Sequence, residues 1–211
     1  MNKTVELVNH WGKFEEEHAG GSIEDFCRHY LARQQHKKMA GTQVGGVVPP
    51  FSDGLLMKII GRISKLNMAY ANLALKGTEL HQIEEFGILQ AVWRQKDPKK
   101  TEVIYANLFE LSSGTDMLNR LKKRGLIKET ADKEDKRSKR ITLTAKGEKV
   151  ARTSVEMIEK NARMLMKDLG EDDKQLCIQL LRNIEIKFSG LWQRHKGAAF
   201  DEIYEEVMGD V

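Results

Sequence analysis

The stretch DKEDKRSKRITLTAKG, from Asp132 to Gly147, decides how this chain folds. It opens with mixed charge, turns strongly basic, and then alternates the apolar residues Ile141 and Leu143 with threonines. Such alternation is typical of a half-buried β-strand. Because LIKET at residues 126–130 reads as a second strand, the sequence predicts a β-hairpin whose solvated tip carries the charged run.

Two short helices are predicted directly before this hairpin. Ile104, Leu108 and Leu111 recur at helical intervals and mark the first helix. The second helix begins at Ser113, whose hydroxyl can cap it, and ends before Gly125. Two short helices joined by a turn of small residues are the plan of a helix-turn-helix. A β-hairpin directly after the second helix is a wing, so a winged helix-turn-helix is predicted.

The second helix and the wing carry side chains that suit a nucleic acid. Hydroxyl and amide groups can bond base edges, and Lys and Arg can bond phosphates. A basic wing tip can follow the phosphate backbone or enter the minor groove. The candidates are Thr115, Asn119, Arg120, Lys122, Lys123 and Arg124 on the helix, and Lys136, Arg137, Lys139 and Arg140 in the wing.

The net charge of +4 conceals an uneven distribution. Residues 94–150 hold 16 Lys and Arg against 9 Asp and Glu, a net charge of +7, whereas the rest of the chain has a net charge of −3. Concentrated positive charge is expected where a protein meets a polyanion such as DNA. A charge run is more often simply a solvated surface, so the order of the surrounding elements is what favours DNA.

The whole chain reads as mainly α with a small β-hairpin wing. Residues 1–54 form an N-terminal extension with one helix, capped near Ser22, and a Gly/Pro loop. A long helix covers 55–76, and the winged helix-turn-helix lobe covers 77–147. Two long apolar helices fill 148–196. The first has Thr144 as candidate N-cap and Gly170 as its stop. A tail at 197–211 can form a short helix. Long apolar helices outside a compact lobe indicate a dimer interface.

Composition and motifs limit the possible classes of function. Apolar residues make up 40% of the chain and charged residues 31%, which suits a soluble, core-forming protein. No run of about 18 apolar residues is present, so no membrane span is expected, and the start lacks a secretory signal. Two cysteines fit a reducing cytoplasm. Phosphate loops, nucleophile elbows and zinc-protease helices are missing, so neither an enzyme nor a cofactor is expected.

The wing segment EDKRSKRITLTAKG and the preceding segment LNRLKKRGLIKE together resemble the MarR (multiple antibiotic resistance regulator) type of winged-helix transcriptional regulator. The resemblance covers roughly residues 55–196. Members of that family carry an Asp-x-Arg in the wing, followed by an apolar strand, Leu-Thr and then Gly. The matching residues here are Asp135, Arg137, Leu143, Thr144 and Gly147.

The resemblance implies a homodimer that binds a pseudo-palindromic operator in double-stranded DNA, represses nearby genes and is released by a small-molecule effector or an oxidant. It implies that Arg137 approaches the minor groove and that Asp135 holds the wing. Asp116 departs from the family, in which many members carry Arg or another donor nearby, so base specificity does not carry over. The recognition helix would contact DNA through Ser112, Ser113, Thr115, Asn119, Arg120 and Lys123.

Several residues leave alternatives open. Tyr70, Phe86 and Trp93 could line an effector pocket, although aromatic residues at helical spacing are also typical of a core. Cys27 could sense redox state, but its place on an apolar stripe favours packing, as for Cys177.

Histidines and acidic residues leave two further questions. The six histidines form no tight pair with a cysteine or a second histidine, so no metal site is expected, although His29 and His36 could share a helix face. The alternative function is a winged helix that binds a partner protein without specific DNA binding. Asp116, Asp132 and Glu134 keep that alternative open.

Overall fold

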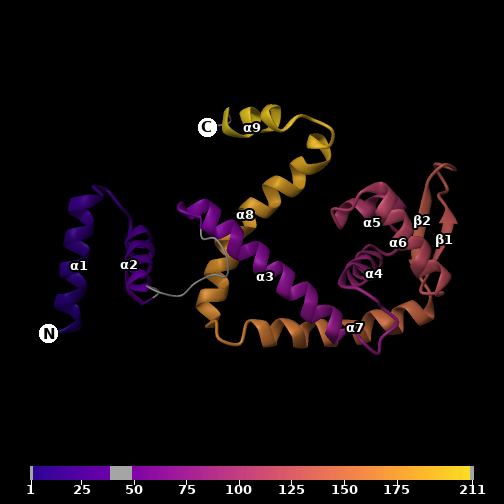
Figure 1. The fold of residues 1–211 in the computed structure, drawn as a ribbon, viewed down its shortest axis with the longest axis horizontal. Coiled ribbons are helices and arrows are strands. Elements are labelled where there is room, and N and C mark those ends of the chain that lie inside the picture. Colours follow the sequence, from indigo (N-terminus) through magenta and orange to yellow (C-terminus); the bar gives the residue numbers. More distant parts are fainter. Residues whose placement is uncertain (1, 39–48, 210–211) are drawn as a thin grey trace. The chain divides into compact units, whose positions relative to one another are not determined.

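The computed structural model describes residues 2–38 and 49–209, except for the side chains of residues 34–38. It is mainly helical with a two-stranded antiparallel sheet, which confirms the predicted fold class (Figure 1). The chain divides into two units, Met1–Ile59 and Ile60–Val211, and each is described by itself. In the described ranges, no helix has the length and apolar character needed to cross a bilayer.

The first unit contains α1 (Lys3–Glu17), α2 (Ile23–Lys38) and the start of α3 (Ser52–Ala74). The sequence predicted α2 together with its cap, and the cap is confirmed. The Asp25 N–H donates to Ser22 Oγ at 3.1 Å, and the Ser22 N–H donates to Asp25 Oδ2 at 3.1 Å. The sequence suggested that His36 could share a helix face with His29, but the His36 side chain lies outside the described residues. So does the middle of the predicted Gly/Pro loop.

Helix α1 was not predicted, and the extension therefore holds a helical hairpin where one helix was expected. Asn2 caps α1 by accepting from the Thr4 N–H at 2.9 Å. Among the apolar residues of α1, Phe14 is buried, whereas Val5 and Val8 are exposed. The prediction that Cys27 packs inside is wrong, because its thiol is exposed on α2.

The second unit contains a winged helix-turn-helix lobe (Figure 1, right of the view). It is built from α4 (Ile83–Gln95), α5 (Lys100–Ala106), α6 (Leu111–Lys123) and the strands β1 (Ile127–Ala131) and β2 (Lys139–Leu143). These elements pack around one apolar core: α4 contacts α5, α6 and β2, and α6 contacts α5 and β1. Fully buried members of the core are Ile88, Leu89, Ile104, Leu118, Leu121, Leu126 and Ile141.

The two strands form the predicted hairpin, and they pair in the register Ile127↔Leu143 to Ala131↔Lys139. The first predicted helix is too long, because α5 ends at Ala106 and the chain turns with Leu108 at a φ of 57°. The prediction that Ser113 caps the second helix is also wrong. Glu110 is the N-cap of α6.

The remaining helices of the second unit are long. Helix α7 (Ala145–Leu165) begins at Thr144, whose hydroxyl accepts from the Gly147 N–H at 3.0 Å, as predicted. It ends about one turn earlier than the sequence suggested, and α8 (Glu171–His195) follows. Helix α9 (Phe200–Gly209) accounts for the short helix predicted in the tail.

Two asparagines and a lysine join the long helices to their neighbours in this unit. The Asn161 side chain on α7 donates to Asn67 on α3 at 2.9 Å. Asn72 on α3 accepts from the Ile83 N–H at 2.7 Å, at the first turn of α4. Lys196, just after α8, lies 3.3 Å from the Glu110 carboxylate at the N-cap of α6. The first bond joins α7 to α3. The other two connect α3 to the start of α4 and the end of α8 to the start of α6.

The expectation that Cys177 packs in a core is not met either, since its thiol on α8 is exposed. Much of the apolar surface of α8 is exposed within the single chain.

Candidate nucleic-acid interface

Helix α6 buries one face and opens the other. Met117, Leu118 and Leu121 are buried against the lobe. Residues spaced by three or four positions share a face of a helix, so four residues fall on the side opposite the core. Ser112, Asp116, Asn119 and Lys123 are exposed there. Three of the predicted contact residues are therefore brought together on one open surface, together with the unexpected acid.

Two other predicted contact residues of α6, Ser113 and Thr115, are not part of this set of four. The Ser113 hydroxyl donates to the Glu110 carbonyl at 3.1 Å, so it stabilises the first turn of the helix. Thr115 is half-buried. Both lie in the first turns of α6, where free backbone N–H groups and the helix dipole attract phosphate.

A buried carboxylate anchors the end of α6. Glu85 on α4 is 1% exposed, and its Oε1 lies 2.5 Å from the Arg124 guanidinium. Its other oxygen accepts from the His81 N–H at 2.9 Å. Arg120 is a looser neighbour, with Nε 3.9 Å from the same carboxylate and a side chain that is 54% exposed. Arg124 therefore holds α6 on α4, while Arg120 keeps a largely exposed guanidinium.

Of the two lysines at the end of α6, Lys122 is paired within the protein and Lys123 faces solvent. Lys122 lies 2.6 Å from the Glu129 carboxylate on β1, and Lys100 lies 3.7 Å from it. The Lys122 ammonium, despite desolvation, lowers the pKa of Glu129, so this acid is ionised at neutral pH. Lys123 faces solvent on the open surface.

An ion pair closes the base of the wing. The Asp132 carboxylate, buried at 2% exposure, accepts from the N–H groups of Asp135 at 2.8 Å and Glu134 at 2.9 Å. It also bonds the Arg140 guanidinium. The two backbone N–H groups, with a smaller contribution from Arg140, lower the pKa of Asp132 to about 2. Arg140 Nη1 further donates to the Asp97 carbonyl at 2.7 Å. The sequence placed Arg140 among the DNA contacts, and its guanidinium is instead engaged within the protein.

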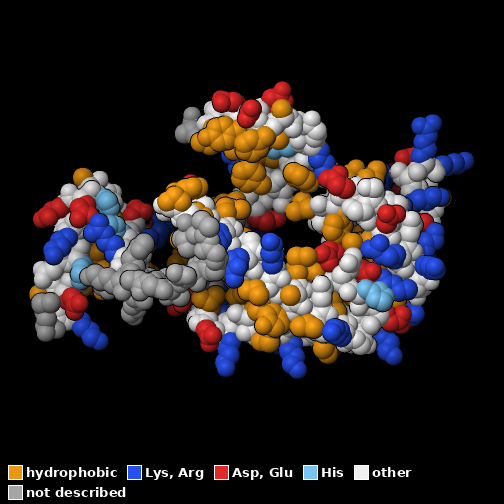
Figure 2. Space-filling model, in the orientation of Figure 1, with side chains coloured by type: hydrophobic (Ala, Val, Ile, Leu, Met, Phe, Trp, Pro, Cys, Tyr) orange, Lys and Arg blue, Asp and Glu red, His pale blue; other side chains and the backbone are white. Residues whose placement is uncertain are grey.

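Asp135 organises the wing tip. Its carboxylate accepts from the Arg137 N–H at 3.0 Å and from the Ser138 hydroxyl at 2.7 Å. The Ser138 hydroxyl is the main cause of the lowered pKa of Asp135. Lys136 and Lys139, like Arg137, are exposed. Figure 2 shows Lys and Arg side chains gathered over the hairpin (upper right of the view). The bonds of Asp135 thus fix the backbone of the tip, from which Lys136, Arg137 and Lys139 extend into solvent.

The predicted effector residues are not gathered in one cavity. Trp93 lines a cavity of about 330 Å³ together with Val92, Asp97, Leu143 and Glu148, among others. Phe86 packs against the core of the lobe, and Tyr70 is 43% exposed on α3. The cavity adjoins β2, so it lies next to the strand that ends the wing.

Comparisons with known proteins agree with this geometry. Residues 84–147 match the family model described as a winged helix DNA-binding domain. The transcriptional regulator HosA of Escherichia coli O157:H7 is 24% identical over 100 residues, which are 47% of this chain and 74% of HosA. Residues 84–147 of the second unit are therefore similar to winged helix DNA-binding domains.

Solved structures extend the likeness to the long helices. A mutant of MarR from E. coli, complexed with operator DNA, matches with a TM-score of 0.58 and 20% identity, covering 61% of this chain and 92% of MarR. The PcaV regulator from Streptomyces coelicolor, in complex with its natural ligand, matches with a TM-score of 0.54 and 19% identity, covering 61% and 90%. This chain has the fold of the MarR regulators, which confirms the predicted resemblance.

Proposed function

We propose that this protein is a MarR-type transcriptional regulator in the cytoplasm, rather than an enzyme, and that it represses genes by binding a pseudo-palindromic operator as a homodimer. The observation that carries the proposal is the open face of α6 beside a wing whose tip presents cations. A helix of this width fits the major groove, and a wing beside it reaches the neighbouring backbone or minor groove. The domain match and the DNA complex of MarR support the same reading.

The exposed residues of α6 suggest which side chains contact base edges and which contact phosphates. Asn119 has an amide that can bond an adenine edge in two places, and Lys123 can bond phosphate or guanine. Ser112 lies in the first turn, where a hydroxyl and free N–H groups suit a phosphate. In the wing, Arg137 is the side chain that we assign to the minor groove, flanked by Lys136 and Lys139.

Asp116 lies on the same open face as these residues. A carboxylate facing phosphate is repelled, but a carboxylate at a base edge can accept from the amino group of cytosine. We therefore assign Asp116 to base selection, which would favour a C·G pair at one position of each half-site. This role separates the base preference of this protein from that of family members with a donor near this position.

The homodimer is proposed from uncovered apolar surface. Monomeric proteins seldom leave large contiguous apolar patches exposed, and a two-fold dimer would bury the same helices from both copies. Figure 2 shows hydrophobic side chains gathered over α9. The exposed residues include Ile63, Leu66, Met68 and Leu73 on α3, Ile178, Leu180, Ile184, Ile186, Phe188 and Trp192 on α8, and Phe200, Tyr204 and Met208 on α9.

Release by a small-molecule effector is the last part of the proposal. The cavity lined by Trp93 and Leu143 adjoins β2 and the first turns of α7. A ligand there would press on the strand that carries Arg140, and so on the orientation of the wing. The ligand complex of PcaV supports effector binding in this fold. Of the three aromatic residues predicted for a pocket, we retain Trp93, since Tyr70 and Phe86 do not line this cavity.

Selection from a pool of randomised duplex DNA tests the proposal. The full chain, reduced and free of added ligand, should enrich an inverted repeat with half-sites about one helical turn apart. The same selection with Asn119→Ala should give a consensus that is relaxed at one position of each half-site. Failure to enrich any sequence at low salt would sink the proposal and favour the winged helix that binds a partner protein.

A further inference from the structure

Helices α1 and α2 form a hairpin with an aromatic interior. Phe14 and Phe26 are 3% and 5% exposed, with ring centroids 5.6 Å apart. Two imidazoles rest edge-on against the same ring: His18 at 4.8 Å from Phe14, and His29 at 5.3 Å. Phe14 therefore supports both histidines from one side, although they come from different elements.

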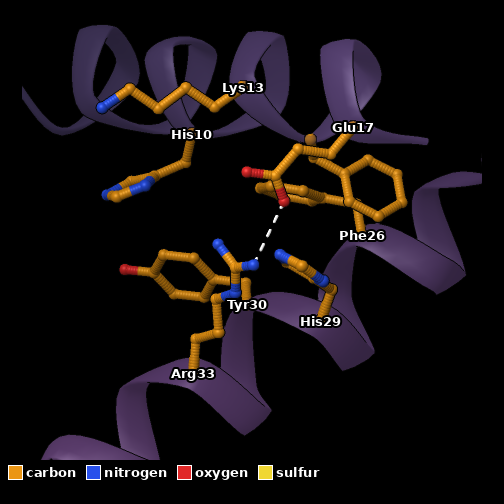
Figure 3. Close-up of a pocket in the computed structure, with 8 residues that line it drawn as sticks. His10, Lys13, Glu17, Phe26, His29, Tyr30 and Arg33 are labelled. Carbon is orange, nitrogen blue, oxygen red and sulfur yellow. Dashed lines mark hydrogen bonds and ion pairs between the residues drawn. The ribbon is translucent and has the colours of Figure 1, made fainter. Parts of the chain in front are cut away.

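The same histidines lie beside a carboxylate. One donor atom from each of Glu17, His18 and His29 lies within 4.8 Å of the other two. Glu17 is the last residue of α1 and His18 is its C-cap, whereas His29 lies in α2. Figure 3 shows the Glu17 carboxylate and the His29 ring directed toward the same space between the helices. The turn between the helices thus assembles three donors that are spread over the sequence.

We propose that Glu17, His18 and His29 bind a divalent transition-metal ion, and that Zn²⁺ is the best fit. Two imidazole nitrogens and one carboxylate oxygen form a donor set that zinc accepts with a water as fourth ligand. Tetrahedral bonds of about 2.1 Å place donors about 3.4 Å apart, so the three side chains need to close by at most about 1.4 Å. Glu17 and His18 are exposed, which leaves them free to make that movement.

Glu17 has a cationic partner that a metal ion would replace. Arg33 Nη2 lies 3.1 Å from Glu17 Oε2, with side chains 66% and 48% exposed. An exposed pair of this kind contributes little stability, so a divalent ion bonded to three donors is the stronger partner. Beside the donors, a cavity of about 290 Å³ between the two helices gives water access to the fourth position (Figure 3).

Equilibrium dialysis of the full chain against ZnCl₂ tests the site, using reduced protein without a histidine tag. The native protein should bind one zinc ion per chain at this site, and His18→Asn and His29→Asn should each weaken that binding at least about tenfold. Glu17→Gln should weaken it in the same direction, because the amide is a poorer ligand. The matched control is His10→Asn, since His10 lies on the same hairpin and packs against Tyr30 at 5.0 Å without joining the donor cluster.

Circular dichroism of each variant checks that the helices remain formed. Absence of zinc binding by the native chain would overturn the proposal, as would affinity in His18→Asn and His29→Asn equal to that of His10→Asn. The result is independent of DNA binding, because dialysis measures the metal alone.

Discussion

Arg140 bonds Asp132 across the base of the wing, and the same guanidinium donates to the Asp97 carbonyl at 2.7 Å in the turn after α4. The Arg140 side chain therefore bonds a second residue of the wing and also the turn that follows α4. The basic run in the sequence has two tasks as a result. Arg140 holds the hairpin, and we propose that Arg137 at the tip meets the DNA.

The first prediction concerns the pH dependence of this ion pair. The pKa of Asp132 is lowered from 3.8 to about 2, so its ionised form stabilises the fold above about pH 4, and that stability is lost as the pH falls through about 2. Asp132→Asn should lower the thermal midpoint at pH 5, and the difference from the native protein should disappear near pH 2. Thermal denaturation at several pH values measures this, and a difference that stays constant with pH would contradict it.

Arg137→Ala should weaken binding to every DNA sequence. If Arg137 neutralises one phosphate, its loss should reduce the slope of log K against log [salt] by about 0.9. Arg163→Ala is the matched control, because Arg163 is 73% exposed on α7, near the end farther from the wing. Fluorescence anisotropy at several salt concentrations gives both slopes. Equal slopes for Arg137→Ala and the native protein would show that this side chain does not contact the backbone.

Gly147→Ala should destabilise the winged lobe. A Cβ at this position would lie 1.9 Å from the Leu126 carbonyl oxygen, which also accepts from the Thr144 N–H at 3.1 Å. Overpacking typically costs about 1–3 kcal/mol, and a backbone atom cannot rotate away, so the thermal midpoint should fall by at least about 4 °C.

The control for this change is Gly12→Ala. Gly12 lies inside α1, and a Cβ there would meet nothing within 4 Å. Alanine favours a helix interior over glycine by about 1 kcal/mol, so the midpoint should not fall. Similar losses for both variants would mean that the contact with Leu126 is not the cause.

Ile184→Glu should dissociate the proposed dimer. Ile184 is 52% exposed on α8 in the single chain, and burying such a side chain contributes about 1.5–3 kcal/mol. A two-fold dimer contains the substitution in both copies, so the loss counts twice. The dimer dissociation constant should therefore rise about 100-fold or more. Gln179→Glu adds the same charge at an exposed polar position of α8, about 140° around the helix from Ile184, and should weaken the dimer much less. Sedimentation equilibrium compares the two, and a native protein that is monomeric at micromolar concentration would refute the dimer.

The sequence predicted the parts of the fold that depend on local signals. Alternation at Ile141 and Leu143 predicted β2, and the Thr144 hydroxyl predicted the start of α7. The turn before α6 was misplaced, because apolar Leu108 fits the helical spacing but adopts a φ of 57° outside any helix.

What the sequence could not predict depends on contacts between distant residues. Nothing local distinguishes Glu85 as a buried carboxylate, since its partner Arg124 is 39 residues away. His18 and His29 look unrelated along the chain, and the turn after α1 brings their rings to 5.0 Å. The open face of α6, in contrast, was predictable from its apolar spacing.

The central claim is that the open face of α6 and the wing together bind double-stranded DNA. Its most direct test is the affinity of the full, reduced chain for its own upstream DNA, measured across a salt series and against random competitor. We predict selective binding that falls steeply and linearly on a plot of log K against log [salt], with a slope that indicates several phosphate contacts. Binding that is absent at low salt, or that hardly responds to salt, would contradict the account.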